Sequence, residues 1–219
     1  ALNLNSTGAS NSAFGNGALG KVNTGGFNTA IGSGAMTENL TGTENTAIGT
    51  FSLYNNKGLS RSTAIGFKAM YYANNSTSAG TSFNTAVGYE ALRGSLTAGN
   101  NTGTNNTAVG DQAMYAYTSG SNNAALGSKA LSANTSGGQN TATGASSLLS
   151  NTTGIENMAS GFQALTGNVT GSYNTAVGSQ SMQQNVSGSD NTAIGYYSLL
   201  NNNSSNNTAV GSYAMEHNT

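Results

Sequence analysis

Apolar side chains recur along this chain at a fixed spacing, separated by runs of Asn, Thr, Ser and Gly. The recurring unit is the pentad Asn-Thr-Ala-Ile/Val-Gly, followed three and four residues after its glycine by Ala or Ser and then by Leu or Met. Successive pentad glycines are 17 residues apart in eight intervals, 22 apart in two and 16 apart in one. We therefore treat residues 1–219 as a single repeat array. The pentad glycines are Gly15, Gly32, Gly49, Gly66, Gly88, Gly110, Gly127, Gly144, Gly161, Gly178, Gly195 and Gly211.

The period predicts an all-β solenoid. Helical-hairpin repeats need about 33 residues or more, so a unit of about 17 fits one coil of a β-solenoid better. Thr-Ala-Ile/Val predicts a first short strand, because β-branched residues favour strands, and the following glycine permits a bend. We expect the Ala-Leu segment to form a second short strand and Asn-x-Thr-Gly to form a turn. About twelve coils stacked about 4.8 Å apart would make a rod of about 55–60 Å.

Stacking of identical coils places equivalent side chains in ladders along the rod. We expect the pentad Asn column to bond buried backbone groups and its own members, as stacked Asn does in cross-β assemblies. The Ile/Val column and the Leu/Met column are expected to be the two sizeable apolar contributions to the core. The three ladders include Asn28, Asn45, Asn84 and Asn106; Ile31, Ile48, Val87 and Val109; and Met36, Leu53, Leu92 and Met114.

Two such columns make a small core, which favours association of several chains. Because strand side chains alternate, Thr and Val are expected on one face of the strand and Ala and Gly on the other. A column of Ala and Gly lets another chain approach closely. We therefore expect a homotrimer, intertwined or side by side, that buries this column.

The two 22-residue units lie within longer coils over residues 67–106. Five extra residues enter between Tyr71 and Phe83, and again between Arg93 and Asn105. Consecutive coils would place the two insertions side by side as a protruding double loop, where repeat proteins commonly bind partners. The candidate partner-binding residues are Tyr71, Tyr72 and Arg93, at the bases of the loops; loops that merely decorate the rod are the open alternative.

The two positions after each pentad glycine vary freely inside a strict repeat, which indicates that they face outward. Several carry aromatic rings, which could stack on sugars or grip a partner surface, or simply cover the rod. The aromatic residues at these positions are Phe51, Phe67, Tyr89, Phe162, Tyr196, Tyr197 and Tyr213.

Composition excludes several classes of function. The chain has 6 Lys+Arg, 7 Asp+Glu, 1 His and a net charge of −1, and only 6% of its residues are charged, against about 25% in ordinary domains. No basic face exists for binding nucleic acid or for attraction to anionic lipid. With no Cys, disulfides and thiolate metal sites cannot form. The composition alone is typical of a disordered chain, but the regular repeat argues against disorder.

Catalytic chemistry has little support. His217 stands alone beside Glu216, where we expect a solvated position. The seven carboxylates are scattered rather than paired, so no glycosidase dyad is indicated, and no regular Asp supports calcium binding. We predict that the chain is not an enzyme and uses no cofactor or metal. Asn-x-Ser/Thr triplets, as at Asn39 and Asn168, are interpreted mainly as turn residues, with glycosylation as the open alternative.

The repeat resembles the head repeats of trimeric autotransporter adhesins, whose coils carry Ser-Val-Ala-Ile-Gly followed by x-x-Ala. Asn28-Thr29-Ala30-Ile31-Gly32 with Ala35 matches that core. It is also similar to the Asn-Thr-Ala-Val-Gly arrays of phage tail-fibre-like and bacterial surface fibre proteins, a form to which residues 161–165 come close. The resemblance covers essentially the whole chain and implies a left-handed parallel β-roll, three chains per fibre and an extracellular setting. Adhesin heads usually have a shorter repeat, and neither a membrane anchor nor a coiled-coil stalk is recognisable in these residues.

We therefore expect a slice of a longer fibre chain: a structural and adhesive extracellular segment, the rod or head of a trimeric surface adhesin or a tail fibre. The expected partners are neighbouring fibre subunits and a cell-surface glycan or host surface, without nucleic acid or membrane insertion. An ice-binding β-solenoid is the alternative, because regular hydroxyl arrays suit ice. Its Thr column, broken at Ala124 and Met158, consists of Thr29, Thr46, Thr63, Thr85, Thr107, Thr141, Thr175, Thr192 and Thr208.

Overall fold

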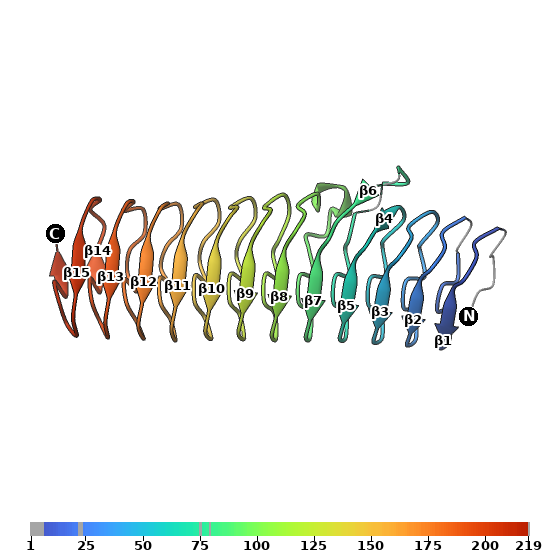
Figure 1. Cartoon of the computed structure of the whole chain (residues 1–219), viewed down its shortest axis with the longest axis horizontal. Coiled ribbons are helices and arrows are strands. Elements are labelled where there is room, and N and C mark those ends of the chain that lie inside the picture. Colours follow the sequence, from blue (N-terminus) through green and yellow to red (C-terminus); the bar gives the residue numbers. More distant parts are fainter. Residues whose placement is uncertain (1–6, 22–23, 75, 79, 219) are drawn as a thin grey trace.

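The computed structural model describes residues 7–21, 24–74, 76–78 and 80–218. They form a long rod in which each repeat makes one coil, as Figure 1 shows. A parallel sheet of twelve strands runs the length of the rod, with one three-residue strand from each coil. The strands are β1 (Ser12–Phe14), β2 (Thr29–Ile31), β3 (Thr46–Ile48), β5 (Thr63–Ile65), β7 (Thr85–Val87), β8 (Thr107–Val109), β9 (Ala124–Leu126), β10 (Thr141–Thr143), β11 (Met158–Ser160), β12 (Thr175–Val177), β13 (Thr192–Ile194) and β15 (Thr208–Val210).

Equivalent residues of successive coils pair in register. Thr29 pairs with Thr46, Ala30 with Ala47 and Ile31 with Ile48, and the pattern continues across the 22-residue coils, where Thr63 pairs with Thr85. The predicted all-β parallel solenoid of about 17-residue coils is therefore confirmed. The register follows from the period, because one turn of chain returns each pentad to the same height on the sheet.

Other regular structure is sparse. β4 (Leu59–Ser60) pairs with β6 (Gly80–Thr81), and β14 (Asn201–Asn202) pairs with β16 (His217–Asn218), both in parallel. One 3₁₀ turn, η1, covers Ala98–Asn100 in the second insertion. No α-helix occurs in the described ranges.

The prediction of a second strand at the Ala-Leu segment is wrong. Residues 34–38 form a turn, and Met36 has a left-handed φ of 51°, which an extended strand does not allow. The backbone there still joins neighbouring coils, because Leu19 N donates to Ala35 O at 3.0 Å and Met36 N donates to Ser52 O at 3.0 Å. The left-handed residue turns the chain and points its long side chain inward.

The core differs from the predicted one in its second column. Ala30 and Ala47 in the strands, and Met36 and Leu53 in the turns, are fully buried, whereas Ile31 is 42% exposed. The expectation that the Ile/Val column fills the core is wrong, and so is the expectation that the Ala column faces another chain. Only alternate residues of a strand point inward, and the narrow coil has room for the methyl group of Ala opposite a Leu or Met.

We expect Leu131→Ala to lower the free energy of unfolding by about 2–5 kcal/mol, because Leu131 is fully buried and its truncation leaves a cavity. Leu96→Ala, in the second insertion where Leu96 is 76% exposed, should change it by less than about 0.5 kcal/mol. Denaturant unfolding of both variants measures the difference, and equal losses would contradict this core.

Candidate functional site

The pentad Asn column forms a buried hydrogen-bonded ladder. Asn45 N and Nδ2 donate to Asn28 Oδ1 at 3.0 and 3.1 Å, and Asn45 Nδ2 also donates to Leu59 O at 2.9 Å. In the longer coils, Asn106 N donates to Asn84 Oδ1 at 2.8 Å. Each amide thus satisfies backbone groups of its neighbours as well as the next amide, which buried polar groups require.

A second Asn ladder lies at the turns and is interrupted where the insertions enter. Asn151 Nδ2 donates to Asn134 Oδ1 at 2.9 Å and to Gly154 O at 3.1 Å. One coil before Asn134 the same position holds Tyr117, which is 3% exposed and donates its hydroxyl proton to Gly103 O. Burial raises the pKa of the Tyr117 phenol well above its usual range. Tyr117 therefore replaces an amide as a neutral donor beside the irregular coils.

Five Asn-x-Ser/Thr triplets place their Asn in this second ladder. These Asn residues are fully buried, and their amide nitrogens donate to the glycine carbonyl three residues later. A folded chain thus offers these amides no room for a sugar. The residues are Asn39, Asn134, Asn151, Asn168 and Asn185.

The outer side of the twelve-stranded sheet carries two parallel columns, the first and third residues of every strand. We call this surface the Thr–Ile/Val face. Ile31, Ile48, Ile65 and Ile194 are 36–42% exposed, and the Thr residues beside them are half-buried or exposed. In the described part of the chain, the hydroxyls of the nine Thr residues of this column make no hydrogen bond. By contrast, Thr118 Oγ1 on another side of the coil donates to Thr135 O at 2.8 Å.

The three predicted loop-base residues lie together. The Tyr71 and Tyr72 rings are 4.7 Å apart, edge to face, and the Arg93 guanidinium lies 5.0 Å from the Tyr72 ring. Arg93 also lies 4.9 Å from the Tyr115 ring, and its Nη1 donates to the Tyr115 hydroxyl at 2.7 Å. Arg93 Nε is 3.3 Å from Glu90 Oε1, an ion pair without hydrogen-bond alignment.

Further rings extend this cluster over four consecutive coils. Tyr54 and Tyr71 are stacked at 5.2 Å, and Phe67 and Tyr89 are stacked at 5.5 Å. Lys68 Nζ lies 5.1 Å from the Phe67 ring and 5.6 Å from the Tyr71 ring. Burial, followed by the Tyr72 phenol, raises the pKa of Tyr71. We call this cluster the aromatic patch; it consists of Tyr54, Phe67, Lys68, Tyr71, Tyr72, Tyr89, Arg93 and Tyr115.

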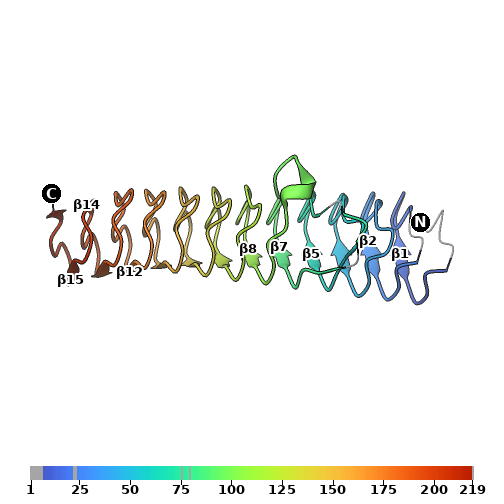
Figure 2. The ribbon, with the colours of Figure 1, turned by 90° about the horizontal axis from the view of Figure 1, so that it is seen from above.

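The two insertions lie at the same edge of the rod, in coils next to each other (Figure 1), and the second also stands out from the rod in the perpendicular view (Figure 2). Asn101 closes the base of the second: its Oδ1 accepts from Ser95 N at 3.0 Å, and its Nδ2 donates to Ser95 O at 3.1 Å and to Tyr72 O. The first leans on an earlier coil, where Thr41 Oγ1 donates to Thr77 O at 3.3 Å. The aromatic patch thus contains residues from the bases of both loops.

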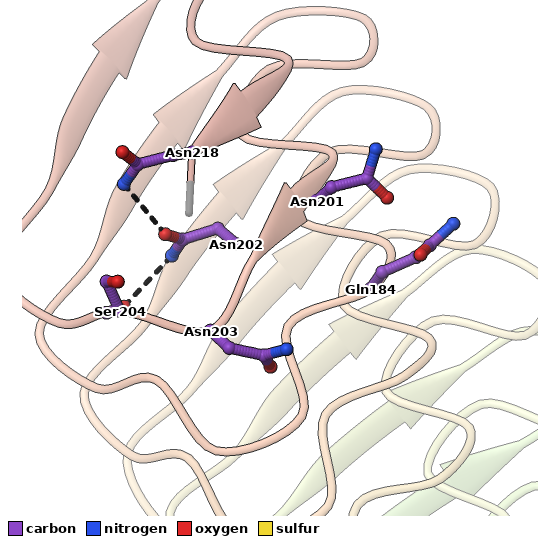
Figure 3. Close-up of a pocket in the computed structure, with 6 residues that line it drawn as sticks. All are labelled: Gln184, Asn201, Asn202, Asn203, Ser204 and Asn218. Carbon is purple, nitrogen blue, oxygen red and sulfur yellow. Dashed lines mark hydrogen bonds between the residues drawn. The ribbon is translucent and has the colours of Figure 1, made fainter.

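No arrangement for catalysis or metal binding appears in the described residues. His217 is exposed, and its Nε2 lies 3.9 Å from Glu216 Oε1. No three His, Asp or Glu residues of the described ranges gather as metal ligands, and these ranges contain no helix long and apolar enough to cross a bilayer. A shallow cavity of about 350 Å³ near β14 and β16 is lined only by amides and one serine (Figure 3). Asn202 lies at the centre of this cavity. Its Nδ2 donates to Ser204 O at 3.0 Å and its Oδ1 accepts from Asn218 Nδ2 at 3.0 Å, so both ends of its side-chain amide are already hydrogen-bonded within the protein.

Sequence reasoning missed several members of the aromatic patch. Tyr54, Tyr71, Arg93 and Tyr115 all stand five residues after a pentad glycine. Reading that position down the repeats would have revealed three tyrosines and an arginine in consecutive coils.

Comparisons with protein-family models, curated proteins and solved structures found no match.

Proposed function

We propose that the chain is a structural and adhesive fibre segment that assembles as a parallel homotrimer through the Thr–Ile/Val face. The single observation that carries the proposal is the aliphatic column along the outer side of the sheet, which runs from Ile31 to Leu126 and resumes from Val177 to Val210 after Thr143 and Ser160, with most of its side chains exposed. Solvent contact of such a long apolar column is unfavourable, and large exposed apolar surfaces commonly mark interaction sites. The sheet extends for about 53 Å, since its eleven strand spacings are each about 4.8 Å.

Assembly in register suits a repeated surface. Chains aligned in parallel around an axis along the rod present equivalent coils at the same height, so each coil whose strand reads Thr-Ala-Ile/Val adds an equivalent contact. The number three follows the resemblance to trimeric adhesin heads. The trimer would leave the inserted loops free for neighbouring fibre subunits, a cell-surface glycan or a host surface, outside a cell or on a virion. This role requires neither catalysis nor a cofactor.

The face itself can be tested with charge. In the double variant Ile48→Lys and Ile65→Lys, we expect the assembly to dissociate toward the 21.8 kDa chain, because each chain would place two ammonium groups in an apolar interface. Both side chains point outward, so the β-type circular dichroism should persist. Tyr173→Lys is the control, since Tyr173 is 50% exposed and outside the face. Dissociation of the control as well would count against this face.

One observation favours ice binding as a second candidate function. The Thr hydroxyls of the face lack hydrogen-bond partners, and five consecutive sheet strands, β2, β3, β5, β7 and β8, all read Thr-Ala-Ile/Val. A buried hydroxyl without a partner costs about 1–3 kcal/mol, so a trimer must bond these groups across its interface or through water. Bound ice would bond them directly.

Thermal hysteresis distinguishes the two functions, because ice and a second chain would compete for one face. An ice-binding chain is monomeric and shows hysteresis that is lost in Thr63→Lys and Thr85→Lys. Association without hysteresis rejects the ice-binding function.

A further inference from the structure

We propose that the aromatic patch binds an acidic polysaccharide, with pyranose rings packed on the Phe67–Tyr89 pair and a sugar carboxylate at Lys68. The inference rests on the proposed adhesive function and names its ligand class and its site. It depends on three features of the described residues: where charge and rings are concentrated, which cation is free, and which ring surfaces are open.

Aromatic and cationic residues are concentrated in the same part of the rod. Residues 51–117 contain 9 of the 16 Phe and Tyr residues. The same segment holds four of the six cations and two of the seven carboxylates, a net charge of +2, so the rest of a chain of net charge −1 carries −3. In a chain with so few charges, this segment is where a polyanion would be attracted.

Lys68 is the cation within the aromatic patch that is available to such a ligand. Lys21 pairs with Glu38 at 2.7 Å, Arg61 with Glu44 at 2.8 Å, and Arg93 with Glu90 at 3.3 Å. Lys68 has no carboxylate partner in the described ranges, and its ammonium is positioned by the Phe67 and Tyr71 rings. Cation–π contacts of this kind orient an ammonium while leaving its protons free for an anion.

The Phe67–Tyr89 pair supplies the apolar surface. The two residues are 39% and 49% exposed, and their rings are nearly parallel, at 11°. The equivalent position is Thr50 one coil before Phe67 and Asp111 one coil after Tyr89, so neither column neighbour covers an outer ring face with another ring. Pyranose C–H groups carry partial positive charge and suit the negative face of a ring. Exposed Asp111 would repel a carboxylate and thus limits the site on that side.

The experiment uses the full chain and polygalacturonate, with dextran as the neutral polymer and polyglutamate as a carboxylate polymer without sugar. We expect binding to polygalacturonate that is stronger than to either comparator and that weakens with salt. Lys68→Gln and Phe67→Ser should each weaken it about fivefold to tenfold. Lys129→Gln and Phe162→Ser should leave it unchanged, because these residues occupy the same coil positions away from the aromatic patch.

Lys68→Gln decides the test if Phe67→Ser lowers stability, since Lys68 supports no backbone hydrogen bond through its side chain in the described structure. Equal binding of dextran, equal binding of polyglutamate, or full binding by Lys68→Gln would each overturn the proposal. Native mass measured on the same samples separates this result from the proposed fibre: a trimer without polygalacturonate binding overturns the site and leaves the fibre standing.

Discussion

Gly144→Ala is expected to lower the free energy of unfolding by more than about 4 kcal/mol, enough to unfold the chain. A Cβ built on Gly144 lies 2.6 Å from Gly161 O and 2.7 Å from Gly161 C, in the next coil. The opposing atoms are backbone in a hydrogen-bonded ladder, where Gly161 N donates to Thr143 O at 2.8 Å, so relief requires separating two coils. Thermal and denaturant unfolding followed by circular dichroism would measure the loss.

Gly211→Ala separates this clash from backbone strain. Gly211 has nearly the same φ, 128° against 126°, but a Cβ there meets only Ala214 Cβ, at 3.9 Å. We expect a cost of about 1–3 kcal/mol, from the unfavourable φ alone. Equal losses in the two variants would contradict the close stacking of coils.

Asn157→Asp is expected to cost about 3–5 kcal/mol at neutral pH. Asn157 is 1% exposed, and its Nδ2 donates to Asn140 Oδ1 at 3.1 Å and to Gly171 O at 2.9 Å. Aspartate has the same shape but brings a negative charge against both acceptors, and breaking a buried network is among the most damaging substitutions. Its oxygen could still accept from Asn174 N, which bonds Asn157 Oδ1 at 3.0 Å.

The loss should depend on pH in a defined direction. Burial raises the carboxyl pKa of the new aspartate above its unfolded value of about 3.9. The folded state then binds the proton more tightly, so stability is greatest below about pH 4 and falls as pH rises through the folded pKa. Asn203→Asp is the control, because Asn203 is exposed and its Oδ1, the acceptor from Val186 N at 2.7 Å, is retained. Denaturant midpoints at pH 4 and pH 7 test this, and a loss independent of pH would contradict a buried ladder.

Much of the fold could be predicted from the sequence repeat alone. The spacing of pentad glycines predicted the coils, and a common pentad predicted the pairing of Thr29 with Thr46. The direction of the strand side chains was not recoverable from hydropathy, which places Ile31 inside. The width of the coil decides instead, because a turn residue such as Met36 fills the space and leaves room only for Ala30. Nor did residue type reveal that Met36 has a left-handed φ of 51°, since Met rarely adopts it.

The candidate surfaces were partly visible in the sequence. The irregular spacing of two repeats pointed to Tyr71, Tyr72 and Arg93, which lie in contact. Lys68 occurs in an ordinary repeat position, so nothing in the period singles it out, and Tyr115 stands out only when the fifth position after the pentad glycine is compared in successive repeats. Lys68 acts through rings of its own coil, Phe67 and Tyr71, whereas Tyr115 joins the patch through Arg93 of the preceding coil, 22 positions earlier in the sequence.

Reversal of the strand faces also changes how association is explained. A buried Ala column leaves the partner chain facing Thr and Ile/Val, so the assembly must cover aliphatic groups and satisfy hydroxyls at once. A Thr–Ile/Val face covered by other chains would support the fibre function, whereas the same face exposed in a stable monomer would suit ice binding.

Native mass by light scattering on a size-exclusion column tests this account most directly. A trimer through the Thr–Ile/Val face predicts a mass near three times 21.8 kDa that persists on dilution. A folded species of 21.8 kDa at every concentration would contradict self-association through this face.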